Sequence, residues 1–494
     1  MQALAMGTFA GDWFRKRVRR TFAAHGRACA GIGAFAAFVA MAGEALAHAS
    51  DRGHVLLLPT GYYAVGGALA VSLSFVLLAF VPPQPLDRLV RAKVRLGRMP
   101  DLRVVTSLVS FAGFAGLIWA GFHGSRDPLS NPLPLVFWTL IWIGLVLMQG
   151  LVGNLWSWID PWRGPCRVAA IMLGRKGEGG FLPYPRRLGY WPAVAGFFGF
   201  AWFELVHAAP DDPARLASVL AAYWAATFLA MLAFGHAAWS RQGEFLTVFM
   251  RMVSRMAVLG RETSGPAIAT ARLPGARLAE QNPLPPSGTI FLLLALSSVS
   301  FDGLMRTFFW FGLNGLNPLE FPGRSAVVGI NTAGLLGMFA LLAVAFLGAV
   351  WLGERLAGRR AGFWQAAGAL VWSIMPISLA YHFSHYLGSL LLNGQYALAA
   401  LSDPLSRGWN LFGTAGLHVS AGVTAGAEAA WVMWNFQAFA IILGHVLAIV
   451  AAHVVAWRRH GDARRAAISQ IPLAALMVGY TVFGLWLLST PTGN

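Results

Sequence analysis

The stretch that decides the fold is residues 326–352, AVVGINTAGLLGMFALLAVAFLGAVWL, which contains no Asp, Glu, Lys, Arg or His. A helix needs ~20 apolar residues to cross the hydrocarbon core of a bilayer, so this run is long enough to span it. Similar apolar runs lie on both sides of it, at residues 62–81, 104–123, 133–154, 189–208, 217–236, 287–312, 363–391, 431–456 and 472–490.

The composition supports the same conclusion. Of the 494 residues, 57% are hydrophobic and 12% are charged, whereas a soluble domain carries roughly 25% charged residues. A soluble fold cannot hide so much apolar surface, so lipid must cover part of it. We therefore predict an all-α, polytopic transmembrane helical bundle of about eleven helices, the first of them a signal-like segment.

The N-terminal segment, residues 1–47, has the layout of a secretory signal. A basic region at residues 15–20 precedes an apolar stretch at residues 28–43 and the A-x-A pattern of residues 45–47. Either it is cleaved, which makes His48 the first mature residue, or it remains as an uncleaved first helix. Residues 48–494 are expected to form a single membrane domain.

The distribution of basic residues predicts the orientation. If the N-terminal basic region is cytoplasmic, alternate connections place 31 of the 37 Lys and Arg residues on the cytoplasmic side. This bias favours a multi-pass protein of the bacterial inner membrane. It also explains the net charge of +17 without a nucleic acid partner, and the expected partner is the lipid bilayer with its anionic headgroups. The six exceptions are Arg52, Arg126, Arg215, Arg306, Arg324 and Arg407.

Two longer connections stand out. Within the cytoplasmic segment 237–286, residues 244–260 read EFLTVFMRMVSRMAVLG, with Arg251 and Arg255 four residues apart. We predict an amphipathic helix on the cytoplasmic leaflet, with a re-entrant element as the alternative. Residues 393–430 are predicted to be a long external loop.

Ionisable residues within membrane helices are costly and mark functional sites. Glu204 and His207 are three residues apart near the outer end of one predicted helix, and His382 and His385 have the same spacing in another. Such i, i+3 pairs supply metal ligands in helical bundles. These residues predict a divalent metal ion near the periplasmic face. The alternative is that each histidine is a hydrogen-bonded packing residue.

Two further residues are candidates for the same site. Asp302 precedes Arg306 by four residues, so it forms an intrahelical salt bridge or acts as a ligand or general base. His48, if it is the mature terminus, offers an amine and an imidazole to a metal; otherwise it is part of a polar tail after the signal. The sequence contains no P-loop, dinucleotide-binding glycine pattern, Gly-x-Ser-x-Gly elbow or CxxC motif.

Three strings carry a resemblance to a known family. They are HASDRGHVLLLPTGYYAVGG at residues 48–67, QGEFLTVFMR at residues 242–251, and PISLAYHFSHYLGSLLLNGQYALAALSDPLSRGWNLFG at residues 376–413. In these the chain resembles bacterial integral membrane proteins known as fenitrothion hydrolases. The resemblance implies hydrolysis of a lipophilic organophosphorus triester to a phenol and a dialkyl phosphorothioate.

A role for each candidate follows from this chemistry. A metal lowers the pKa of bound water and polarises the phosphoryl group. We expect Glu204, His207, His382 and His385 to hold one or two ions, and Asp302 to orient the attacking hydroxide. A transporter is the first alternative, in which external histidines capture an ion and His445 and His453 pass it or a proton inward. A non-catalytic membrane assembly subunit is the second.

Overall fold

The computed structural model describes residues 60–81, 83–98, 100–175, 179–262, 268–317, 323–359, 361–423 and 426–490. The predicted signal-like segment and His48 lie outside these residues. The described helices belong to one compact unit.

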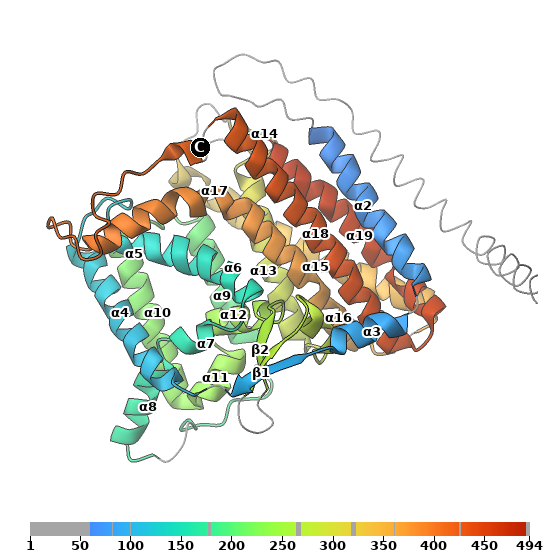
Figure 1. The fold of residues 1–494 in the computed structure, drawn as a ribbon, viewed down its shortest axis with the longest axis horizontal. Helices are drawn as coiled ribbons and strands as arrows, with labels where there is room; N and C mark the ends of the chain where they lie inside the picture. The colour runs from blue at the N-terminus through green and yellow to red at the C-terminus, as the bar shows by residue number, and fades with distance from the viewer. Residues whose placement is uncertain are drawn as a thin grey trace, which may run out of the picture. The chain divides into compact units, whose positions relative to one another are not determined.

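The architecture is a bundle of long apolar helices (Figure 1), so the all-α membrane fold is confirmed. Nine helical segments of the described residues are long and apolar enough to cross a bilayer, and each coincides with a predicted run. They are α2 (Thr60–Phe80), α4 (Arg103–His123), α5–η1–α6 (Pro132–Pro134, Leu135–Leu145, Val146–Leu151), α10 (Pro213–Phe234), α13 (Pro286–Met305), η4–α15 (Arg324–Val327, Val328–Leu356), α16–η5–α17 (Phe363–Leu370, Val371–Ile374, Met375–Ser402), α18 (Ala427–His460) and α19 (Ala463–Ser489).

A small antiparallel sheet, absent from the prediction, joins two connections that are distant in sequence. Strand β3 (Ile268–Ala271) lies between β1 (Val94–Arg98) and β2 (Leu259–Glu262). The connection after α2 and the connection before α13 therefore lie on the same face of the bundle.

This pairing settles the role of α9 (Trp191–Leu205), which corresponds to the predicted run 189–208. With 15 residues, α9 is only ~22 Å long, whereas the hydrocarbon core is ~30 Å thick. Between β1 and β2 the chain crosses in α4, in α5–η1–α6 and in α10. Because both strands lie on one face, the number of crossings must be even, so α9 and the residues flanking it make the fourth.

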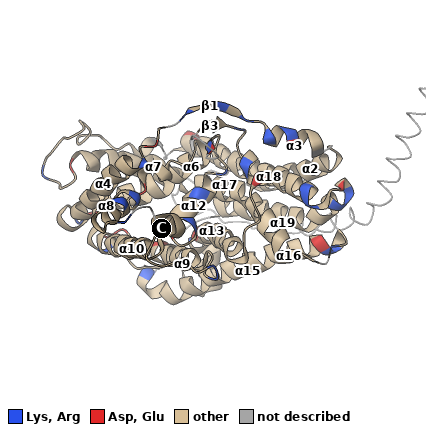
Figure 2. Ribbon diagram, turned by 90° about the horizontal axis from the view of Figure 1, so that it is seen from below, with Lys and Arg blue, Asp and Glu red and all other residues tan. Residues whose placement is uncertain are grey.

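The same face is held together by arginines at the end of α18. Arg458 pairs with Asp87 of α3 (Pro83–Arg91) at 2.6 Å and donates to the Ala279 carbonyl, and Arg459 pairs with Glu354 of α15 at 2.8 Å. We call this the basic face; it carries α3, β1–β3, α7 (Trp156–Ile159), α8 (Arg163–Met172), η2 (Ala276–Glu280) and the ends of α15 and α18 (Figure 2). Across the bundle, the opposite face carries the connections that follow α4, α9 and α13.

The prediction of a surface amphipathic helix at residues 244–260 is wrong. Helix α12 (Phe245–Val253) is buried on nearly all sides, and its Phe249 ring contacts Phe197 of α9 and Trp142 of η1. Only Thr247 and Arg251 of its nine residues are partly exposed, so its polar side is a narrow stripe and neighbouring helices cover the rest. The structure agrees instead with an element inserted among the spans, following α11 (His236–Gln242).

The external loop 393–430 is also shorter than predicted. Helix α17 continues to Ser402, because residues 394–402 are rich in the helix formers Ala and Leu. The loop begins at Asp403, whose carboxylate accepts hydrogen bonds from the backbone N–H groups of Arg407 and Gly408. A single turn, η6 (Ala421–Val423), precedes α18.

The crossing by α9 can be tested by cysteine accessibility. In a chain with Cys29 and Cys166 replaced by serine, Arg187→Cys precedes α9 and Arg215→Cys follows it. We expect a membrane-impermeant maleimide to label the two sites from opposite sides of a sealed vesicle. Arg98→Cys on β1 serves as the control and should label from the same side as Arg187→Cys. Labelling of Arg187→Cys and Arg215→Cys from one side would contradict the topology.

Candidate functional site

Charged side chains from three helices meet towards the opposite face. We call Glu204 of α9, Asp302 and Arg306 of α13, and His385 and Tyr386 of α17 the carboxylate cluster. Arg306 is the residue at which α13 ends; Thr307 then accepts a hydrogen bond from the Trp310 N–H and starts α14 (Phe308–Leu313). This break exposes the Arg306 side chain next to a buried carboxylate.

Asp302 is the centre of the cluster, and its side chain is 1% exposed. One carboxylate oxygen accepts hydrogen bonds from Arg306, at 3.1 Å from Nε and 2.9 Å from Nη2. The other accepts from His385 Nε2 and from the Tyr386 hydroxyl, both at 2.7 Å. The intrahelical salt bridge is therefore present, but it involves only one of the two carboxylate oxygens of Asp302.

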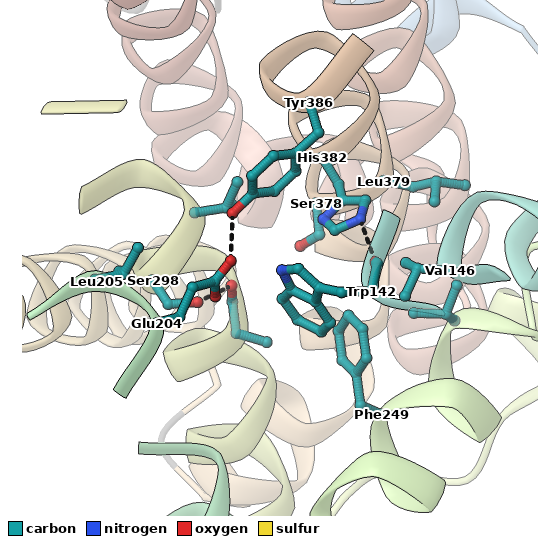
Figure 3. A pocket seen from close by; sticks show the side chains of 13 residues that line it. Trp142, Val146, Glu204, Leu205, Phe249, Ser298, Ser378, Leu379, His382 and Tyr386 are labelled. Carbon is teal, nitrogen blue, oxygen red and sulfur yellow. Dashed lines mark hydrogen bonds between the residues drawn. The ribbon is translucent and has the colours of Figure 1, made fainter. Parts of the chain in front are cut away.

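Tyr386 links the two carboxylates of the cluster. Its hydroxyl lies 2.7 Å from Asp302 Oδ2 and 3.0 Å from Glu204 Oε1 (Figure 3). The hydroxyl has one proton, so it donates to one carboxylate at a time. The buried Asp302 and the partly buried Glu204 thus share a single phenol as hydrogen-bond partner.

His382 does not join its predicted partners. Its Nε2 donates to the Trp142 carbonyl at 2.8 Å (Figure 3), and the side chain is buried. Trp142 belongs to η1, which is π-helical along 11 residues, and π-helical turns in α-helices occur frequently at functional sites. The Trp142 indole lies beside Glu204, so this residue contacts both His382 and the cluster.

His207 is also separate from Glu204. Helix α9 ends at Leu205, so the i, i+3 relation that would bring the two side chains to one face is lost. The His207 ring accepts a hydrogen bond from the Ala209 N–H at 3.2 Å and lies against Phe203. His48 lies outside the described residues.

These positions do not assemble the predicted metal site. Among the residues that the structure describes, no group of three or more His, Cys, Asp or Glu side chains is arranged to hold a metal ion. His385 and Asp302 are together, but Glu204 lies on the far side of Tyr386, and His382 and His207 have other partners. We therefore derive no chemical step through a metal.

Two charged residues that the sequence analysis did not assign to the site complete its surroundings. Arg324 of η4 donates to the carbonyls of Glu204 and Leu205, at 2.9 and 3.1 Å, and so caps the end of α9. Asp211, which follows α9, is exposed and lies near Arg324 and Arg306. In the sequence, Arg324 was marked only as one of the few arginines predicted to be external. Tyr386 was marked only by its position next to His385.

A small cavity lies beside the cluster. It is lined by polar groups of Glu204, Ser298, Ser378, His382 and Tyr386 together with Trp142 (Figure 3). Its volume is about 20 Å³, which is enough for one water molecule. The Ser378 hydroxyl has no hydrogen-bond partner in the described residues, as expected for a group that binds water. A triester does not fit inside.

No protein-family model, curated protein or solved structure matches this chain.

The bridging role of Tyr386 predicts a loss of stability on Tyr386→Phe. The variant leaves the two carboxylates without their shared donor, which costs about 1–3 kcal/mol. Thermal unfolding of the purified protein in detergent measures this loss. Tyr396→Phe is the matched control, because Tyr396 lies on the same helix but outside the cluster. Equal melting temperatures for the two variants would contradict the bridge.

Proposed function

We propose that the chain is a membrane-bound hydrolase of neutral, lipophilic phosphotriesters that uses His385 as its general base. The observation that carries this proposal is the pairing of His385 with Asp302 at 2.7 Å, in which the carboxylate is 1% exposed and the imidazole 21% exposed. A buried carboxylate that holds one ring nitrogen of an accessible histidine fixes the tautomer and orientation of the ring. Histidine bases of hydrolases are oriented in this way.

The proposed reaction needs only groups of the cluster and one water molecule. His385 Nε2 faces Asp302, so Nδ1 takes the proton as the water oxygen bonds to phosphorus. The bond between phosphorus and the aryl oxygen breaks, and the departing phenolate takes its proton from the imidazolium. The guanidinium of Arg306, held by Asp302 and half exposed, stabilises the negative charge that develops on the phosphoryl or thiophosphoryl group.

The substrate would bind on the accessible side of His385 and Arg306, since the enclosed cavity holds only water. A neutral triester partitions into the bilayer and reaches this position along the membrane. The excess of Lys and Arg on the basic face favours a cytoplasmic location for that face. The site would then lie near the periplasmic surface of a bacterial inner membrane. The three sequence strings that resemble fenitrothion hydrolases support the choice of substrate class.

The test is hydrolysis of fenitrothion by the purified protein in detergent, measured as release of the phenol. We expect His385→Ala and Asp302→Asn each to lower the rate about 100-fold or more, as for loss of a general base. His382→Gln is the control, because the Gln amide nitrogen stands close to the Nε2 position and can still donate to the Trp142 carbonyl, and its rate should stay within a few-fold of the wild type.

Removal of bound metal separates this mechanism from the metal-assisted one. The His385–Asp302 pair, here called the dyad, needs no metal ion. Wild-type protein treated with a chelator should therefore keep its activity. Activity that is lost on chelation and returns with zinc or manganese would reject the dyad and support the metal-assisted mechanism. Full activity in His385→Ala would reject His385 both as general base and as metal ligand.

A second function, proton-coupled transport, is favoured by the link from Asp302 through Tyr386 to Glu204 and the water-sized cavity. Because Asp302 already faces Arg306 and His385, Glu204 is the member of the pair that would exchange a proton with the cavity. Deeper in the bundle, His445 and His453 are buried on α18 and would continue the path.

Sealed proteoliposomes separate these functions. Phenol release that does not depend on a proton gradient supports the hydrolase. Solute accumulation that requires a gradient and is lost in Glu204→Gln supports the transporter. If neither activity is found, the remaining alternative is a membrane assembly subunit.

A further inference from the structure

A second cavity lies at the basic face, far from the carboxylate cluster. Helix α8 and the residues after it form one wall, and the end of α10 with the start of α11 forms the other. Its volume is about 30 Å³. The basic side chains that line it are Arg163, Arg167, Arg175 and His236, and the described residues of its lining include no Asp or Glu.

The positions of these arginines follow from the helix. Arg163 and Arg167 are four residues apart on α8, so they lie on one side of it. Arg175 follows the helix and is held by its hydrogen bond to the Gly180 carbonyl, at 2.6 Å, and by stacking on the Phe181 ring at 4.3 Å. The arginines therefore stand around a fixed opening rather than along an extended surface.

His236, the first residue of α11, lines the same cavity. Its Nε2 pairs with Asp160 at 2.8 Å, so this carboxylate already has a partner. Its Nδ1 is buried and has no hydrogen-bond partner within the described part of the chain. A buried polar atom of this kind needs a ligand or water. The cavity thus combines positive charge with an unfilled hydrogen-bonding position.

Large apolar side chains surround the opening. Ile171, Met172 and Leu173 at the end of α8 are 62%, 83% and 54% exposed, and Phe181 and Leu182 across the opening are also exposed. Exposed apolar residues on an amphipathic helix at a membrane face insert into the headgroup region. A ligand at this position would therefore have its anionic group among arginines and its apolar part against these side chains.

We propose that this cavity is a specific site for the phosphate group of an anionic phospholipid in the leaflet at the basic face. The guanidinium group is suited to phosphate because its N–H groups match two oxygens at once. The alternative for basic residues at such a face is general attraction to anionic headgroups. A confined cavity whose described lining carries three arginines and no carboxylate, bordered by apolar side chains, favours one bound lipid over a diffuse layer.

The experiment is a lipid titration of the full-length protein in detergent, followed by native mass spectrometry. We expect one molecule of phosphatidylglycerol to bind in preference to phosphatidylcholine. In Arg167→Gln/Arg175→Gln, the affinity for phosphatidylglycerol should be about tenfold weaker. Arg464→Gln/Arg465→Gln is the matched control, because both arginines are exposed at the start of α19 and outside the cavity. Its affinity should be unchanged.

Each other outcome decides against the proposal. Equal weakening in both double variants would show general charge attraction, and no preference for phosphatidylglycerol would exclude an anionic-lipid site. If inorganic phosphate displaces phosphatidylglycerol at equal concentration, the site is one for free phosphate and the lipid assignment fails. Should the double variant not fold, the exposed single change Arg167→Gln gives the same comparison against Arg464→Gln, with an expected loss of several-fold.

Discussion

The Asp302 carboxylate, with its hydrogen bonds to Arg306, His385 and Tyr386, is the interaction on which the rest of the site depends. A charge on a membrane helix costs about 2.5–3.5 kcal/mol at the helix centre. Asp302 lies on α13, which is buried along most of its length. Its charge is tolerated because a cation on the next helical turn and two donors from α17 surround it. These same bonds fix α17 against α13 and, through Tyr386, against α9.

The position of this charge is set by where helices end. Helix α9 stops at Leu205, with its last carbonyls bound by Arg324, and α13 stops at Met305, before the turn that begins α14. At this turn Arg306 is half exposed, while Asp302 one helical turn earlier is buried. The cluster thus has one enclosed side, next to the water-sized cavity, and one accessible side.

The long apolar runs could be predicted from sequence because crossing a bilayer demands length and hydrophobicity, and both are local properties. The sheet could not, since β1 and β3 are far apart in sequence and their pairing depends on the packed helices.

The spacing of residues in the sequence was a partial guide to the site. It placed His382 and His385 on one helix, but His382 donates its hydrogen bond to the Trp142 carbonyl on another helix. It paired Glu204 with His207, but α9 ends between them. The two readings of Asp302, salt bridge and functional carboxylate, were not exclusive: its oxygens serve different partners.

The described part of the chain holds two Asp–His pairs of nearly equal length, and they differ in how accessible the imidazole is. Asp160 and His236 lie 2.8 Å apart at the basic face with both side chains about 5% exposed or less. The hydrogen bond and charge of His236 outweigh the effect of burial and hold the pKa of Asp160 below its usual value. This pair joins the residue that follows α7 to the first residue of α11. In the Asp302–His385 pair, at 2.7 Å, the imidazole is 21% exposed and a guanidinium stands beside the carboxylate. A hydrogen bond between carboxylate and imidazole is therefore not sufficient for hydrolysis. Access to the imidazole distinguishes the candidate base from the structural pair, because His385 is 21% exposed and His236 is 5% exposed.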